Sequence, residues 1–452
     1  MSKDKILLNA PPFVRNILIN IYGYKLAKVR FNSTFKKYHK ILIDNLSKSK
    51  EEIDSEQFKF MKNTLIFAYE NIEYYKKTFN ENRFVPYDFD DYKQLTILPL
   101  LDKSIIRNNF SQLINKNISS GKFQKHTTSG STGEKLTFLH PTELTFAINA
   151  AFNYRFYSLA DVYPLDRRVT IGGRYFTNKP PFWAYNKFEN QLLMSSHHLS
   201  SNTIQDYISK ILQFKPAFIQ GHPSSILFIA QYMLERNIKV NQQYKAIFTT
   251  GETLTEENKA IIEAAFNTIV LQQYGSGESC FSAQETPEKN GFMLNYEHGY
   301  VELIGEGEYK EVVATSFLNP VMPFIRYKIG DLVSPISEKV DSKWNLPFLF
   351  DKVLGRIDDM LLCTSGDKIL PVTIRMQVKP YLKEFTNYQI VQNDRFDFTL
   401  NLIDENKVID VKSIVQIIKK NIGDSIKIEV KYVDALMSKG GKIRNIINRM
   451  QK

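Results

Sequence analysis

Short apolar segments alternate with amphipathic ones between residues 167 and 275, and this alternation restricts the fold more than any other feature. Four segments have the length and the β-branched composition of buried strands: RRVTIGG (167–173), PAFIQGHP (216–223), KAIFTTGE (245–252) and TIVLQQYG (268–275). The stretches between them repeat apolar residues at helical spacing: 203–214, 224–235 and 255–266. Strands that alternate with helices predict βαβ units and a parallel sheet.

Polar turns stand at the ends of these expected strands. The segments GHPSS, TTGE and YGSGES each follow an apolar run. Open α/β sheets bind their ligands outside the carboxyl ends of the strands. We therefore expect the functional residues in these turns.

The rest of the chain predicts further units, because 452 residues are too many for a single compact core. Residues 50–115 have a mostly helical periodicity, residues 143–159 predict another helix, and short strands begin at Tyr300. We predict an α/β fold class in three parts: a helical, basic N-terminal region (1–90), a large α/β body of several subdomains (91–354) and a small, mobile α+β C-terminal domain (355–452).

The segment HTTSGSTGEKLTF (126–138) gathers small and hydroxyl-bearing residues around two glycines. Such residues let consecutive backbone N–H groups turn inward and form an anion-binding concavity, to which a lysine adds positive charge. The segment matches neither the Walker A pattern nor the GxGxxG dinucleotide fingerprint. Alone, it is equally compatible with a flexible loop.

Five more motifs follow in order: TTGE (249–252), YGSGE (274–278), RYKIGDL (326–332), GRIDDML (355–361) and SKGGKIR (438–444). Singly, IGDL is compatible with a hairpin turn and GRIDD with a surface linker. Together, their order and spacing resemble the adenylate-forming superfamily, whose members convert an acid and ATP into an acyl-adenylate and pyrophosphate. The resemblance is strongest to the phenylacetate–CoA ligase branch, especially CapK-like proteins associated with capsular polysaccharide synthesis, and it runs from about residue 90 to the end.

The resemblance implies a nucleotide site. It assigns the phosphate loop to Thr128, Ser129, Gly130, Ser131, Thr132, Gly133 and Lys135. Gly251 and Glu252 would lie against the adenine and the ribose. Tyr274, followed by Gly275, would stack on the adenine, for which an aromatic face is suited.

The resemblance also implies catalytic groups. Glu278 resembles the acid that holds Mg²⁺ against the phosphates, in keeping with the preference of Mg²⁺ for one or two carboxylates plus phosphate oxygens. Asp331 resembles an acceptor of ribose hydroxyls, Arg326 an upstream cation that is either near the phosphates or structural, and Arg356 marks the hinge. Lys442 resembles a mobile lysine that stabilises negative charge during adenylation and then withdraws for a second half-reaction.

The sequence departs from the family pattern at three places. Glu134 precedes Lys135, so the lysine is shifted by one position and the usual proline is missing. Gly277 stands where Thr or Ser is usual, and a hydroxyl that would bind the α-phosphate is lost. Where relatives carry a cluster resembling a zinc site, this chain offers Cys280 and His298, and two ligands do not make a tetrahedral site. We expect no zinc.

Two adjacent histidines, His197 and His198, fall near the expected acyl pocket. They are compatible with a catalytic role, but partly exposed loop histidines are commoner, so their role stays open. The sequence has no GxSxG elbow, which leaves a hydrolase without support.

Positive charge gathers at the N-terminus. Residues 1–50 hold eleven Lys or Arg against two Asp, a net charge of +9. Such a basic, partly amphipathic segment fits either contact with an anionic membrane or a helical appendage packed on the body. No nucleic-acid-binding motif is present, so we expect no nucleic-acid partner. The sequence also lacks an apolar span and a signal peptide, and two distant cysteines, Cys280 and Cys363, indicate a reducing cytoplasm.

These features predict a cytoplasmic enzyme, with peripheral membrane contact as a further expectation. It would use ATP and Mg²⁺ to adenylate a small-molecule acid, and coenzyme A, an amine or a sugar would accept the activated group. By resemblance, it would serve capsular or surface polysaccharide synthesis. Two alternatives stay open: a nucleotidyltransferase that leaves AMP on its product, and a non-catalytic nucleotide-binding scaffold in a polysaccharide-assembly complex. The sequence identifies neither the acid nor the oligomeric state.

Overall fold

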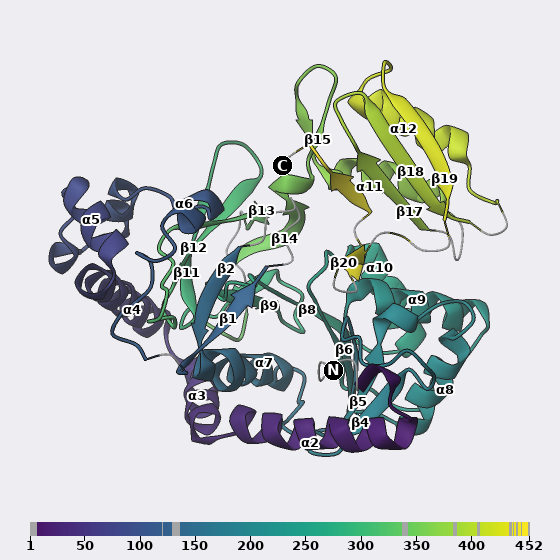
Figure 1. Cartoon of the computed structure of the whole chain (residues 1–452), viewed down its shortest axis with the longest axis horizontal. Coiled ribbons are helices and arrows are strands. Elements are labelled where there is room, and N and C mark those ends of the chain that lie inside the picture. The colour runs from purple at the N-terminus through teal and green to yellow at the C-terminus, as the bar shows by residue number, and fades with distance from the viewer. Residues whose placement is uncertain are drawn as a thin grey trace.

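The structure is a computed structural model that describes residues 7–119, 121–128, 136–336, 342–382, 387–404, 407–433, 436, 438–439, 442–443 and 445–450. Its largest feature is a twelve-stranded sheet in the order β11-β12-β13-β14-β10-β9-β8-β7-β6-β3-β5-β4. Figure 1 shows this sheet with the C-terminal unit above it and helix α2 along the lower edge.

One half of the sheet is parallel and confirms the expected βαβ units. Its strands are β3 (Arg168–Gly172), β5 (Gln191–Ser195), β6 (Phe218–Gly221), β7 (Ala246–Thr250) and β8 (Val270–Gly275), with the antiparallel strand β4 (Trp183–Asn186) at the edge. Successive strand residues face opposite sides. Ile247 packs in the apolar cluster formed with α8 (Ile204–Phe214), α9 (Pro223–Glu235) and α10 (Glu256–Phe266), whereas Phe248 packs in the cluster of α7 (Asn149–Ser158). Helices therefore cover both faces, and the α/β prediction is confirmed.

The other half of the sheet is antiparallel. Its strands are β9 (Ser282–Glu285), β10 (Phe292–Leu294), β11 (Gly299–Ile304), β12 (Lys310–Ser316), β13 (Tyr327–Pro335) and β14 (Phe348–Arg356). Pairing changes from parallel to antiparallel between β8 and β9. The YGSGES segment lies at this change.

The N-terminal region is helical: α2 (Pro12–Arg30), α3 (Ser33–Asp44), α4 (Lys50–Asn71), α5 (Glu73–Glu81) and α6 (Lys103–Asn108). Helix α2 lies against the edge strand β4, where Asn20 Nδ2 donates to the carbonyl of Tyr185 at 2.9 Å. The first helical segment is thus packed on the body, as one of the two interpretations of its charge proposes. No helix among the described residues combines the length and the apolar character needed to cross a bilayer.

A separate hairpin precedes the parallel half. Strands β1 (Phe123–Thr127) and β2 (Thr137–Pro141) pair antiparallel and flank the hydroxyl-rich segment. The helix predicted over 143–159 follows directly, as a π-helical turn (Leu144–Ile148) that continues into α7.

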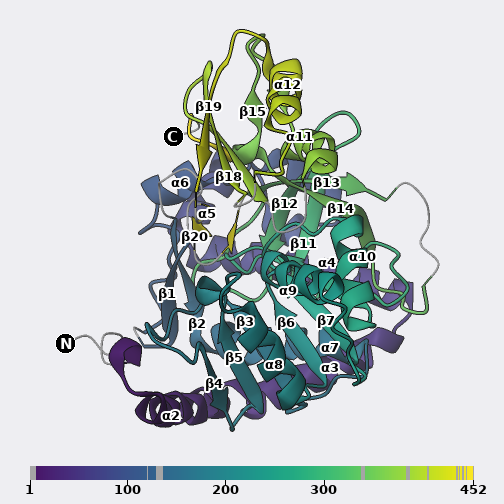
Figure 2. The ribbon, with the colours of Figure 1, turned by 90° about the vertical axis from the view of Figure 1, so that its right-hand side faces the viewer.

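The C-terminal unit has a sheet of its own. The strands of this sheet are, in order, β19 (Lys427–Tyr432), β18 (Asp397–Ile403), β17 (Asn387–Gln392) and β22 (Ile446–Asn448). The unit also contains the helices α11 (Pro371–Val378) and α12 (Val411–Ile422). Two short strand pairs complete it: β15 (Leu361–Leu362) with β16 (Lys368–Ile369), and β20 (Ser438–Lys439) with β21 (Lys442–Ile443). Ile414, Ile418 and Ile422 bury one face of α12 in its core. Figure 2 shows the unit standing above the body, joined to it through the short helix η6 (Ile357–Asp359) after β14.

Candidate active site

The carboxyl ends of β6, β7 and β8 bring the predicted turns to one edge of the sheet. Gly251 follows β7 with φ +85°, a left-handed conformation that favours glycine. The carboxylate of Glu252 accepts hydrogen bonds from the backbone N–H and the hydroxyl of Ser224, at 2.9 and 3.1 Å. Ser224 lies in the first turn of α9, so Glu252 ties the β7 turn to the start of that helix. Its predicted contact with the nucleotide stays a prediction.

Tyr274, at the end of β8, sits in a cage of aromatic side chains. Its ring lies 5.4 Å from Phe281, 6.3 Å from Phe292 and 5.5 Å from Phe350, centroid to centroid and at steep angles. Its hydroxyl donates to Asp331 Oδ2 at 2.8 Å. Burial, and secondly the charge of Asp331, raise the pKa of Tyr274 well above its usual range. The phenol therefore stays protonated and orients the carboxylate.

Asp331 also faces Arg356 across two neighbouring strands. The two residues are register partners in β13 and β14, and Arg356 Nη1 lies 3.6 Å from Asp331 Oδ1. Gly330 has φ +81°, and a Cβ there would lie 3.3 Å from Arg356 Nη2. The hairpin turn with which IGDL is compatible is not formed, because this segment lies inside β13 at a register shift against β12. At this bulge Gly330 adopts a positive φ, a backbone conformation that glycine also adopts in turns.

Glu278 lies next to this pair and is tied to a second tyrosine. Tyr327 donates its hydroxyl proton to Glu278 Oε1 at 3.0 Å. Burial, and secondly the charge of Glu278, raise the pKa of Tyr327 well above its usual range. The carboxylates of Asp331 and Glu278 are thus each held by a tyrosine hydroxyl.

The phosphate-loop hairpin is linked to the same place. His140 of β2 lies with Nε2 2.8 Å from the carbonyl oxygen of Glu278, and burial lowers the pKa of His140 to about 4. Thr128 closes the end of the hairpin, where its hydroxyl accepts from the N–H of Leu136 at 3.1 Å. The predicted loop residues Ser129, Gly130, Ser131, Thr132, Gly133 and Lys135 lie outside the described residues.

The carboxylate of Glu278 is a suitable donor for Mg²⁺. Mg²⁺ in nucleotide sites takes one or two carboxylates and completes its shell with phosphate oxygens and water. Tyr327 donates to one oxygen of this carboxylate, and the residue Glu278 is 9% exposed. Within the described part of the chain, no group of three His, Cys, Asp or Glu could hold a metal ion without a substrate. The Glu278 carboxylate, with one oxygen left by Tyr327, fits a metal whose other ligands are phosphate oxygens and water.

Arg326 lies away from these residues, against the helical region. Its guanidinium donates to both carboxylate oxygens of Glu302, at 2.9 to 3.2 Å, and to the carbonyls of Leu95 and Leu98. Its φ is +52°, an uncommon conformation for a residue with a side chain. Of the two roles considered for Arg326, these contacts support the structural one.

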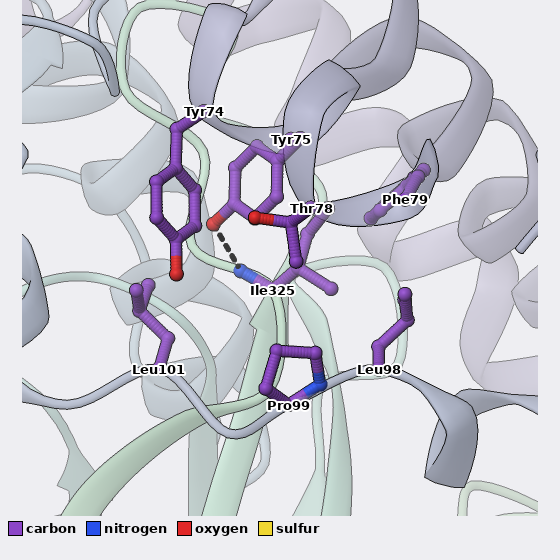
Figure 3. A pocket seen from close by; sticks show the side chains of 8 residues that line it. All are labelled: Tyr74, Tyr75, Thr78, Phe79, Leu98, Pro99, Leu101 and Ile325. Atoms are coloured by element: carbon purple, nitrogen blue, oxygen red, sulfur yellow. Dashed lines mark hydrogen bonds between the residues drawn. The ribbon is translucent and has the colours of Figure 1, made fainter. Parts of the chain in front are cut away.

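The segment beside Arg326 is fixed by Tyr75 of α5. The Tyr75 hydroxyl accepts from the N–H of Ile325 at 3.0 Å and donates to the carbonyl of Pro323 at 2.9 Å. Figure 3 shows this contact beside a small hollow that Tyr75 and Ile325 line with Leu98 and Pro99. The hollow lies between the helical region and the body, and neither Asp331 nor Glu278 lines it.

Replacing Arg326 with leucine should therefore destabilise the fold by about 3–5 kcal/mol, because Glu302 would keep its charge without its buried partner. Urea unfolding followed by tryptophan fluorescence measures this change. The matched control is Lys116→Met, which removes an ion pair with Glu73 whose side chains are 72% and 58% exposed. The control should cost at most about 1 kcal/mol. An Arg326→Leu protein of unchanged stability that no longer binds ATP would place Arg326 at the phosphates instead.

Known proteins are similar to this chain in sequence and in architecture. No protein-family model matches it. Protein CapK of Staphylococcus aureus is 28% identical over 459 residues, covering 98% of both chains. A phenylacetate-coenzyme A ligase of Aromatoleum evansii is 24% identical over 72% of this chain and 75% of its own.

The solved structure of 2-hydroxyisobutyryl-CoA ligase, in the postadenylation state with 2-HIB-AMP, has the same fold. It superposes with a TM-score of 0.67 at 16% identity, over 89% of this chain and 91% of the ligase. These similarities support the adenylate-forming superfamily for this chain. Within it, they support the branch of CapK and the phenylacetate–CoA ligases.

Lys442, the predicted mobile lysine, lies in a short hairpin of the C-terminal unit. Strands β20 and β21 pair antiparallel, with Lys439 opposite Lys442. Figures 1 and 2 show the hairpin projecting from the C-terminal unit toward the body. The side chain of Lys442 lies outside the described part of the chain, so its catalytic role stays a prediction.

Gly277, where the superfamily usually has a hydroxyl, has room for one. A Cβ added to Gly277 meets no atom of the described residues within 4 Å, and its φ is not positive. Replacing Gly277 with serine should leave the fold intact and, if the hydroxyl reaches the α-phosphate, raise adenylation efficiency about two- to tenfold, the worth of one hydrogen bond. ATP–pyrophosphate exchange measures this change, with Gly277→Ala as the matched control. Equal rates for both variants would mean that the missing hydroxyl has no role here.

The pair considered for zinc is part of the core. His298 is buried, stacks on Phe152 at 4.7 Å, and has its two ring nitrogens 2.9 Å from the hydroxyls of Ser282 and Ser279. Burial lowers its pKa to about 3, so the ring is neutral. Cys280 is also fully buried. These contacts satisfy His298 without a metal, and the expectation of no zinc stays a prediction.

The adjacent histidines lie at the carboxyl end of β5. His197 Nε2 lies 3.0 Å from the carbonyl oxygen of Gly173, and His198 stacks between Tyr175 and Phe182 at 5.0 and 4.2 Å. Burial, and secondly His197, lower the pKa of His198. Neither contact assigns them a role in the chemistry.

Sequence reasoning missed Tyr327 and His140, which contact the side chain and the backbone of Glu278. Tyr327 stands inside the RYKIGDL motif, and His140 follows the hydroxyl-rich segment, but their partner Glu278 is far from both in sequence. Only the position of Tyr327 within a recognised motif could have drawn attention to it.

Proposed function

We propose that this chain, an AMP-forming ligase by its family, activates a carboxylic acid with Mg·ATP and transfers the acyl group to an acceptor. The observation that supports it is the cluster of Tyr274, Asp331 and Arg356 beside Tyr327 and Glu278 at the carboxyl edge of the sheet. Two oriented carboxylates at such an edge suit a nucleotide with its metal.

The roles within this site follow the chemistry of the groups. Asp331 would accept hydrogen bonds from the ribose hydroxyls, and the ring of Tyr274 would contact the adenine. Glu278 would hold Mg²⁺, which when bound neutralises phosphate charge. Residues 128–135 would bind the phosphates with Gly251 and Glu252 beside the base. Lys442 would supply positive charge to the α-phosphate as the carboxylate attacks it.

Coenzyme A is the acceptor that we propose first, because several of the similar proteins are coenzyme A ligases. Similarity to CapK over nearly the whole chain supports a place in capsular or surface polysaccharide synthesis, with an amine or a sugar as the acceptor. A cytoplasmic location fits either acceptor. Contact of the basic N-terminal segment with an anionic membrane stays a proposal.

ATP–pyrophosphate exchange over a panel of aryl, fatty, amino and sugar acids tests the proposed function. Exchange that depends on one class of acid, followed by release of AMP when coenzyme A is added, is the expected result. Acid-dependent exchange that continues without AMP release on adding coenzyme A would point to another acceptor.

Two results would contradict the proposal. ATP binding in a calorimeter without exchange for any acid would favour the scaffold. Recovery of AMP covalently attached to a product would favour the nucleotidyltransferase. The departures at Glu134 and Gly277 are the features that give these alternatives weight.

A further inference from the structure

Helix α2 carries an unusual number of exposed apolar side chains. Seven large apolar residues on this one helix are exposed: Phe13, Val14, Ile17, Ile21, Tyr22, Tyr24 and Val29. Phe13 is 76% exposed, Ile17 45% and Ile21 51%. At 3.6 residues per turn, Phe13, Ile17, Ile21 and Tyr24 fall on one side of the helix. We call this side, with Val14, Lys25 and Lys28, the outer face of α2.

The outer face is held in place by the opposite side of the helix. Arg15 is buried and donates to the hydroxyl of Thr177 and to the carbonyls of Lys179 and Pro181. Gly23 lies so close to β4 that a Cβ there would be 2.2 Å from Asn186 Oδ1. The helix therefore cannot roll to bury its outer side, and the apolar stripe faces outward.

The positive charge around this apolar stripe indicates what kind of partner would bind it. Residues 12–43 contain seven Lys or Arg and no Asp or Glu. Lys25 and Lys28 lie on the outer face itself, and Lys28 Nζ sits 4.5 Å above the ring of Tyr24. An apolar stripe edged by lysines and tyrosines is the pattern of a helix that lies in the interface of an anionic membrane.

We propose that the outer face of α2 docks the protein onto an anionic lipid surface. The apolar side chains enter the boundary between headgroups and acyl chains, and Lys25 and Lys28 meet the lipid phosphates. A second copy of the chain fits less well, since a symmetric contact would bring two such faces of the same charge together. Figures 1 and 2 show α2 at the end of the molecule remote from the C-terminal unit, so docking leaves that unit clear of the bilayer.

Sedimentation with vesicles tests this surface on the full chain. The vesicles are phosphatidylcholine alone and an equimolar mixture of phosphatidylcholine and phosphatidylglycerol. The wild type should bind the anionic vesicles, and binding should fall as salt rises. The variant Phe13→Gln/Ile17→Gln/Ile21→Gln should bind the anionic vesicles at least about tenfold more weakly. It loses apolar area that would be buried in the membrane, while glutamine preserves the helix.

Matched controls test whether vesicle binding is specific to this face or comes from exposed apolar residues in general. Val85, Leu234 and Val408 are exposed to similar extents, 51%, 43% and 46%, elsewhere on the molecule. Changing all three to glutamine should leave vesicle binding unchanged. The variant Lys25→Gln/Lys28→Gln should lose most of the preference for anionic over neutral vesicles. Circular dichroism melting and acid-dependent exchange confirm that each variant is folded.

Three results would overturn the proposal. One is a wild type that binds neither kind of vesicle. Another is equal vesicle binding by the wild type and the Phe13→Gln/Ile17→Gln/Ile21→Gln variant. The third is a wild-type dimer in light scattering that only this variant abolishes, which would assign the face to self-association. All of these are independent of which acid the site activates.

Discussion

Replacing Lys442 with alanine should lower ATP–pyrophosphate exchange by about a hundred- to a thousandfold, with little change in the stability of the fold. The lysine would act on charge that develops in the transition state, where removal of one preorganised donor has an effect of this size. Its hairpin belongs to the C-terminal unit, so the charge would come from outside the sheet that carries the proposed nucleotide site.

The second half-reaction gives a sharper test of the same residue. If Lys442 withdraws after adenylation, transfer from a chemically prepared acyl-adenylate to coenzyme A should be nearly unchanged in Lys442→Ala. The control is Lys439→Ala, since Lys439 is the register partner of Lys442 in the same hairpin. Equal losses in both half-reactions, or in both variants, would contradict a specific role in adenylation.

The parallel half of the fold could be predicted because its strands are buried on both faces. Ile247 and Phe248 pack in clusters on opposite sides of β7, so the strand is apolar throughout and stands out against the helices. The hairpin of β4 and β5 could not be predicted in this way. Only β5 is largely apolar, and β4 is an edge strand covered by α2.

The site was less predictable, because its contacts join distant parts of the chain. The motifs identified Tyr274, Glu278 and Asp331 one by one. Their mutual orientation depends on hydrogen bonds between residues that meet only after the sheet forms, such as Tyr327 with Glu278. The IGDL segment left two structures open for a related reason: a glycine with positive φ occurs in a strand bulge as well as in a turn.

Replacing Asp331 with alanine should raise the KM for ATP and lower exchange efficiency by about ten- to a hundredfold. The carboxylate would lose its hydrogen bonds to the ribose, and hydrogen bonds to a charged group are worth about 1.5–3 kcal/mol. Arg356, 3.6 Å away, would also lose its acidic partner. Initial rates of exchange over a range of ATP concentrations measure the effect.

Tyr274→Phe distinguishes the ribose role of Asp331 from a merely structural one. This change removes the phenol that donates to Asp331 but keeps the ring among its three phenylalanine neighbours. Exchange should fall several times less than in Asp331→Ala, because the carboxylate remains available to the ribose. In the double variant, the tyrosine change should add almost nothing, since its hydroxyl acts through Asp331. If Tyr274→Phe alone were as damaging as Asp331→Ala, the pair would serve to hold β8 to β13, and the nucleotide would have to be bound elsewhere.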